Sequence, residues 1–209
     1  MSFIGSILII ILVSGLGLHV IAVRDVPIGL TGKGVGWGLV GAVAEAEMII
    51  LLCSEEAVVD WLIFSVFGGC LLLACITDAI LQQVYCFVWW IAMLAAGILL
   101  WRGTITGYAS GTIFQTLSMF TIFTALQYMV FGRTYGRADC HAFVSCALME
   151  TALGLQFEVY FIHMIISYTF LTIAQILRRN VSKTGKLIRQ VPFIPYINLS
   201  FWLMLGISL

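Results

Sequence analysis

The feature that most constrains this chain is a series of eight long apolar runs, separated by short polar or turn-forming segments, along 209 residues. Each run has roughly the 17 to 25 residues that a helix needs to cross the hydrocarbon core of a bilayer. Their approximate bounds are 3–23, 35–53, 58–76, 84–100, 108–131, 139–155, 159–177 and 192–209. Helices satisfy their own backbone hydrogen bonds inside hydrocarbon. We therefore expect an all-α bundle of about eight transmembrane helices, forming a single integral membrane domain over residues 1–209.

Composition supports a protein embedded in a lipid bilayer. Hydrophobic residues make up 62% of the chain and charged residues 10%, whereas a soluble domain carries about 25% charged residues. The formal net charge is zero, so nothing in the charge balance indicates a nucleic-acid partner. The first run lacks a basic n-region and a small-residue cleavage site, which favours a retained helix over a signal peptide. The six cysteines include no C-x-x-C pair, and we expect no metal and no cofactor.

Basic residues predict the orientation of the bundle. With eight spans, nine of the ten basic residues fall on one side of the membrane, and Arg102 falls on the other. By the positive-inside rule the basic side is the cytoplasm. We expect a multi-pass protein of the inner (cytoplasmic) membrane. The nine residues are Arg24, Lys33, Arg133, Arg137, Arg178, Arg179, Lys183, Lys186 and Arg189.

Two aspartates are predicted to lie at this cytoplasmic face. Asp78 follows the third run, and Asp139 opens the sixth. Two nearby carboxyl groups cannot both ionise readily, so they share one proton. The ionised member can then take a proton from water while the protonated member polarises a carbonyl, without a metal. A purely structural role is also possible for each aspartate, as an ordinary helix cap.

Three segments of the chain carry a resemblance to a known family. Gly136-Arg-Ala-Asp139 resembles the Gly-x-Gly-Asp motif of the type IV prepilin peptidases, which are membrane aspartic proteases. Cys75-Ile-Thr-Asp78, followed by Val84 and a long apolar run, is similar to the first aspartate segment of that family. Val191-Pro-Phe-Ile-Pro-Tyr196 resembles its Pro-Phe-Gly-Pro segment. The three lie in the family's order and spacing over about 71–209.

The resemblance implies an intramembrane aspartic endopeptidase whose active site faces the cytoplasm. Asp78 and Asp139 would activate water to cleave the short basic leader of a prepilin- or pseudopilin-like substrate. The implied partners are that membrane protein and the lipid bilayer, with no cofactor, no metal and no nucleic acid. The motif positions that would support the catalytic pair are Gly136, Ala138, His141, Pro192 and Pro195.

The chain also departs from the family pattern. Ala138 replaces the second glycine of the motif, Tyr85 stands where proline is usual, Ile194 replaces a glycine, and His141 stands where lysine is common. An added Cβ at Ala138 matters if the backbone there must adopt an unusual dihedral or approach the substrate. The loop after the first run is short and has no cysteine. The chain therefore resembles the peptidase-only form, without the cytoplasmic domain linked to methylation.

Three further acids leave a second class of function open. Glu45 and Glu47 fall inside the second run, and Glu150 inside the sixth. Acids at such depth usually face the interior of a bundle. A transporter would need these glutamates, whereas a peptidase would need the aspartates. A degenerate scaffold of a pilus assembly is also compatible with the sequence, and so is a presenilin-like protease, because the presenilin family shares the Gly-x-Gly-Asp motif.

Overall fold

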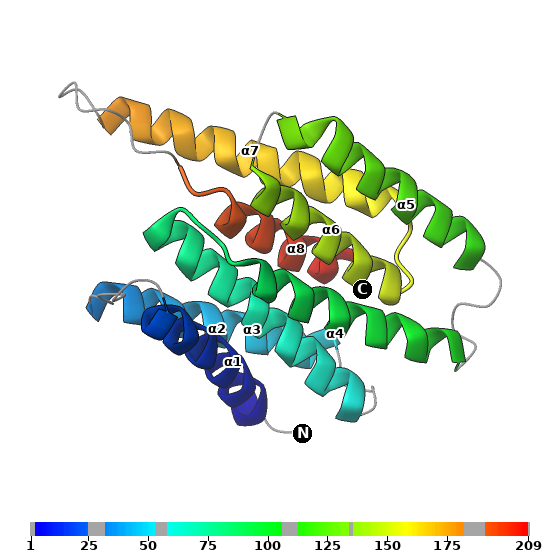
Figure 1. Cartoon of the computed structure of the whole chain (residues 1–209), viewed down its shortest axis with the longest axis horizontal. Helices are drawn as coiled ribbons and strands as arrows, with labels where there is room; N and C mark the ends of the chain where they lie inside the picture. Colours follow the sequence, from blue (N-terminus) through cyan, green and yellow to red (C-terminus); the bar gives the residue numbers. More distant parts are fainter. Residues whose placement is uncertain are drawn as a thin grey trace.

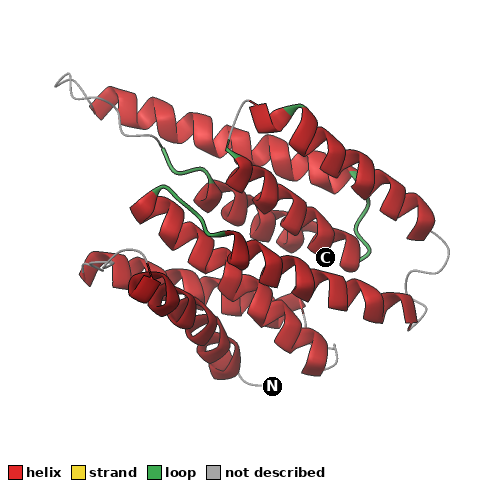
Figure 2. Cartoon of the chain, in the orientation of Figure 1, coloured by secondary structure: helices red, strands yellow, loops and turns green. Residues whose placement is uncertain are grey.

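A computed structural model describes residues 3–24, 32–52, 58–105, 113–133, 136–181 and 191–208. This part of the chain is helical with short connections and contains no strand (Figure 1, Figure 2). The all-α prediction is confirmed. The elements are α1 (Phe3–Arg24), α2 (Gly32–Leu52), α3 (Val58–Leu81), α4 (Cys86–Ile105), α5 (Ile113–Met129), the short 3₁₀ helix η1 (Phe131–Arg133), α6 (Arg137–Ala152), α7 (Glu158–Val181) and α8 (Ile194–Ser208).

The ends of two helices show why the predicted runs and the helices agree closely. Helix α6 ends in a Schellman motif, in which the N–H of Leu155 bonds to the carbonyl of Glu150, and Gly154 has a φ of 73°. Glycine adopts this left-handed backbone without a steric penalty. Helix α8 begins after Pro192 and carries Pro195 in its first turn. Proline lacks a backbone N–H, but this removes no helical hydrogen bond in the first turn, where N–H groups have no partner within the helix.

Helix α3 is longer than the run that predicts it. The run ends near residue 76, but the helix continues to Leu81 because the residues of its last turn include no helix breaker. It stops at Gln82, which has a φ of 56° and donates its N–H to the carbonyl of Asp78, 3.0 Å away. Asp78 therefore lies inside the last turn of α3 and not beyond its end.

Four helices among the described residues are long and apolar enough to cross a membrane. They are α1 over Ile4–Ala22, α3, α4, and α7 over Glu158–Leu177. Helix α4 turns large apolar side chains outward, with Trp90 74% and Trp101 68% exposed. An apolar exterior of this kind suits lipid and not water. The structure thus supports a membrane protein, while crossing by all eight helices stays a prediction.

Consecutive helices run in alternating directions through the bundle (Figure 1). The C-terminal ends of α1, α3, α5 and α7 therefore lie at the same end as the N-terminal ends of α2, α4, α6 and α8. Six of the basic residues predicted to share a face lie in helices at or near this end, and Arg102 lies toward the opposite end of α4. The six are Arg24, Lys33, Arg133, Arg137, Arg178 and Arg179. The remaining three, Lys183, Lys186 and Arg189, lie outside the described residues.

Helix α3 is central to the bundle because it packs against α1, α2, α4 and α8. Aromatic pairs join it to α8: the ring centroids of Phe67 and Phe201 are 5.5 Å apart, and those of Phe64 and Trp202 are 5.8 Å apart. A Cβ on Gly69 would lie only 2.8 Å from the Cβ of Val13 on α1, so this glycine permits close helix packing. These contacts hold α3, and with it Asp78, in one position.

Candidate functional site

Asp78 is partly buried in the last turn of α3. Its Oδ2 accepts a hydrogen bond from the N–H of Ile194, 3.0 Å away, and the backbone of Phe193 supplies a second one. These amides stand at the start of α8, where N–H groups have no partner within the helix. Burial of Asp78 disfavours the ionised form of its carboxyl group, and these hydrogen bonds oppose that effect in part. The Asp78 carboxyl group therefore binds backbone N–H groups at the start of α8.

Asp139 is partly buried in the first turn of α6. Its Oδ2 accepts a hydrogen bond from the N–H of Gly136 at 3.1 Å, and Gly136 is the N-cap residue of the helix. A carboxylate in this position also interacts favourably with the helix dipole. Capping of α6 is thus one role of Asp139. In this role its carboxyl group lies at the N-terminal end of α6.

The two aspartates come from different helices at the same end of the bundle. Helices α3 and α6 both pack against α4 and α8. Both carboxyl groups are partly buried there, and the charge of Asp78 acts on Asp139 across the two helices. Because like charges repel in partly buried positions, ionisation of both carboxyl groups at once is disfavoured.

The remaining residues of the predicted site surround these two segments. His141 is partly buried, and its Nδ1 contacts the hydroxyl of Tyr128, with the ring centroids 5.3 Å apart. This contact ties α5 to α6 beside Asp139. Pro192 and Pro195 flank the two residues that bond to Asp78 and are both partly buried. They position the turn that leads into α8.

The departures from the family pattern leave both aspartates in place. Ala138 lies in α6, whose backbone is right-handed; positive φ values among the described residues occur at Gln82 and Gly154. The backbone conformation at Ala138 therefore creates no requirement for glycine. Ile194 is 1% exposed and still donates its N–H to Asp78. The ring of Tyr85 faces that of Phe87, with centroids 6.2 Å apart.

Hydropathy does not reveal every polar partner in the core. Of the three mid-helix glutamates, Glu45 and Glu150 are buried, whereas Glu47 is exposed. Glu45 Oε1 accepts a hydrogen bond of 2.7 Å from Nδ2 of Asn198 on α8. The signal that points to Asn198 is an amide side chain within an otherwise apolar helix. Glu150 lies against His163 of α7.

The described ranges hold no group of three or more His, Cys, Asp or Glu side chains arranged to bind a metal ion. No protein-family model, curated protein or solved structure matches the chain significantly. The likeness to the prepilin peptidases thus rests on the three sequence segments and on no wider similarity.

Proposed function

We propose that this protein is a membrane aspartic endopeptidase that removes the short basic leader of prepilin-like substrates. The observation that supports this proposal best is the placement of Asp78 in the last turn of α3 and of Asp139 in the first turn of α6, at the same end of the bundle (Figure 1). Each aspartate occupies its position in the segments that resemble the prepilin peptidases. Both stand at helix ends, where a substrate that leaves the membrane would present its peptide backbone.

The proposed reaction needs one ionised and one protonated carboxyl group. The ionised carboxylate takes a proton from water as the water oxygen forms a bond to the scissile carbonyl carbon. The protonated carboxyl donates a hydrogen bond to the carbonyl oxygen, which stabilises the tetrahedral intermediate. When the C–N bond breaks, the nitrogen of the leaving amine receives the proton. The pair returns to its one-proton state, and no metal takes part.

Cleavage of a prepilin tests this function directly. The protein is co-expressed with a candidate prepilin, and the leader is followed by the shift of the substrate on a blot. We expect a shortened product, and we expect a chelator such as EDTA to leave its yield unchanged. A panel of prepilin and pseudopilin substrates that all remain full length beside correctly inserted protein would contradict the proposal.

The proposed orientation places both aspartates at the cytoplasmic face. In a cysteine-free background, a cysteine at Glu55 should react with an impermeant maleimide in intact cells, whereas one at Lys183 should react only after permeabilisation. Both positions lie outside the described residues, and the expectation follows from the positive-inside rule. The reverse labelling pattern would place the aspartates on the outer face.

The buried glutamates favour a second candidate, a proton-coupled transporter. Glu45 and Glu150 are 3% and 0% exposed, and each lies in the bundle interior as transporter acids do. Replacement of either by glutamine should abolish proton-coupled transport, because an amide does not exchange protons. The same replacements should leave substrate cleavage measurable if the peptidase proposal is correct.

A further inference from the structure

The first turn and a half of α8 is held by ionisable side chains from three directions. Asp78 of α3 accepts the N–H of Ile194. Glu45 of α2 accepts a hydrogen bond from the side chain of Asn198. His163 of α7 bonds through Nε2 to the carbonyl oxygen of Ile197 at 2.9 Å. Residues 194 to 198 therefore connect the candidate catalytic end to the polar groups of the core.

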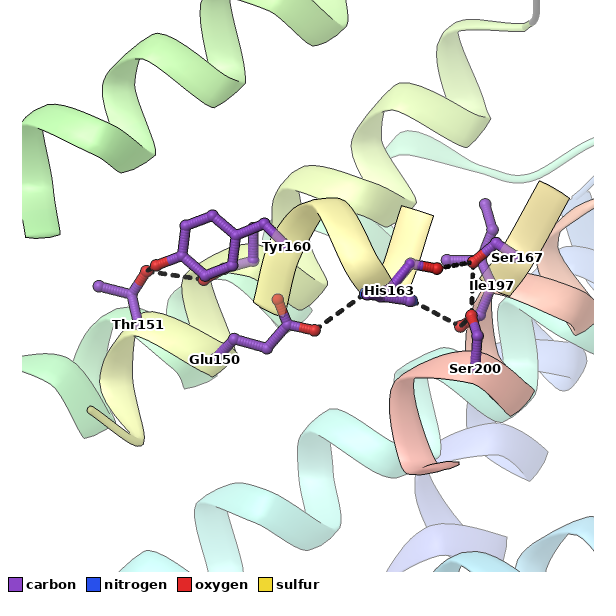
Figure 3. Close-up of polar contacts among 8 residues, drawn as sticks. Glu150, Thr151, Tyr160, His163, Ser167, Ile197 and Ser200 are labelled. Atoms are coloured by element: carbon purple, nitrogen blue, oxygen red, sulfur yellow. Dashed lines mark hydrogen bonds and ion pairs between the residues drawn. The ribbon is translucent and has the colours of Figure 1, made fainter. Parts of the chain in front are cut away.

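His163 joins α8 to a second acid (Figure 3). Its Nδ1 lies 2.9 Å from Oε1 of Glu150 on α6, with side-chain exposures of 2% and 0%. The two atoms are close, although neither carboxyl oxygen of Glu150 has a hydrogen-bond partner among the described residues.

The contact with Ile197 fixes where one proton of His163 lies. A carbonyl oxygen only accepts, so Nε2 of His163 carries the proton that bonds to Ile197. The other ring nitrogen, Nδ1, faces Oε1 of Glu150 in the interior of the bundle.

Neighbouring polar groups reinforce this link between α7 and α8. The hydroxyl of Ser167 donates to the carbonyl of His163 and contacts the hydroxyl of Ser200. Ser200 in turn donates to the carbonyl of Ile197 at 2.9 Å. Figure 3 shows these groups converging on one side of α8. Among the described residues, the charge of Glu150 also acts on Cys146 of α6 and on Tyr160 of α7, whose hydroxyl contacts Thr151.

We propose that Glu150 and His163 are positioning residues for Asp78. They hold the carbonyl of Ile197, which lies three residues, or about 4.5 Å of helix, beyond Ile194. A shift of α8 at Ile197 would move the N–H groups of Phe193 and Ile194 away from the Asp78 carboxylate. The pair thus acts on the reaction through α8. This inference rests on the proposed peptidase function.

Three variants separate positioning from simple packing. Glu150→Gln keeps the contact, because its amide donates a hydrogen bond to Nδ1. Glu150→Ala removes the contact. The double variant Glu150→Leu with His163→Phe replaces both polar groups by apolar ones of similar size, an exchange that buried ion pairs often tolerate. It therefore tests the positioning role in protein that remains folded.

We expect Glu150→Gln to cleave a prepilin within threefold of the wild-type rate. Glu150→Ala and the double variant should lose about 10- to 100-fold in kcat, the scale of a small misplacement of reacting groups, with KM changed less. The acidic limb of their pH–rate profile should move to higher pH, because the aspartate pair loses hydrogen-bond donors that favour the ionised form of Asp78. A wild-type rate and pH profile in the double variant would overturn the proposal. So would Glu150→Gln losing as much activity as Glu150→Ala.

Amide hydrogen exchange of the segment from Phe193 to Asn198 tests the same inference without substrate. The wild-type protein and Glu150→Gln should exchange slowly there, and Glu150→Ala and the double variant at least tenfold faster. Equal exchange in all four proteins would overturn the proposal. If the wild-type protein cleaves no prepilin, the peptidase function fails, while the exchange rates still decide whether the pair holds α8.

Discussion

Asp78→Asn and Asp139→Asn should each abolish cleavage of a prepilin, lowering kcat/KM by about 10³- to 10⁴-fold, the upper range for general acid–base catalysis. An asparagine can neither take a proton from water nor supply one. The double variant should be no worse than either single variant, because residues that act in one step are not additive. The pH–rate profile of the wild-type protein should be bell-shaped, with limbs that belong to the pair.

Asp60→Asn is the matched control for these two variants. Asp60 lies in α3, like Asp78, but near the opposite end of the helix, where its Oδ1 lies 2.6 Å from Nε of Arg102. Loss of this partly exposed ion pair should cost at most about 1 kcal/mol of stability and leave cleavage intact. If either Asp78→Asn or Asp139→Asn, folded and inserted, processes a prepilin at a near wild-type rate, the aspartic peptidase assignment is wrong.

Gly69→Ala should destabilise the bundle by about 1–3 kcal/mol, the usual cost of overpacking a core. The added Cβ would lie 2.8 Å from the Cβ of Val13 and 3.3 Å from the backbone carbonyl oxygen of Ile10. A backbone atom cannot move aside as the tip of a flexible side chain can, so α1 must separate from α3. Gly69→Leu should prevent this packing altogether and yield little folded protein.

Thermal unfolding in detergent measures this effect, with Gly97→Ala as the control. Gly97 lies in α4, and a Cβ there would meet no atom within 4 Å. Alanine also favours a helix over glycine by about 1 kcal/mol. We expect Gly69→Ala to lower Tm by roughly 2–12 °C and Gly97→Ala to leave it unchanged or raise it. Equal Tm values for the two variants would contradict the described contact between α1 and α3.

The class of the fold and the approximate bounds of its helices could be predicted from the amino-acid sequence alone. The length of an apolar run predicts the length of the helix. The breaks between runs contain turn-forming residues such as Gly154 and Pro192, which mark the helix ends. Alternating helix directions follow from short connections, so the common end of Asp78 and Asp139 was also predictable. Equally large differences in position occur at the ends of α3 and α4, which are predicted near residues 76 and 100 but continue to Leu81 and Ile105.

Which side chains meet depends on how the helices pack. Glu45 and Glu47 have the same predicted depth, yet one is 3% exposed and the other lies on the exposed surface. A run that is apolar on all sides carries little periodicity that shows which face is buried. The bond from Ile194 to Asp78 joins residues 116 positions apart and uses a backbone N–H. Contacts between residues so far apart in the sequence depend on how closely the helices approach one another, as α3 and α1 do at Gly69. The amino-acid composition does not determine these approaches.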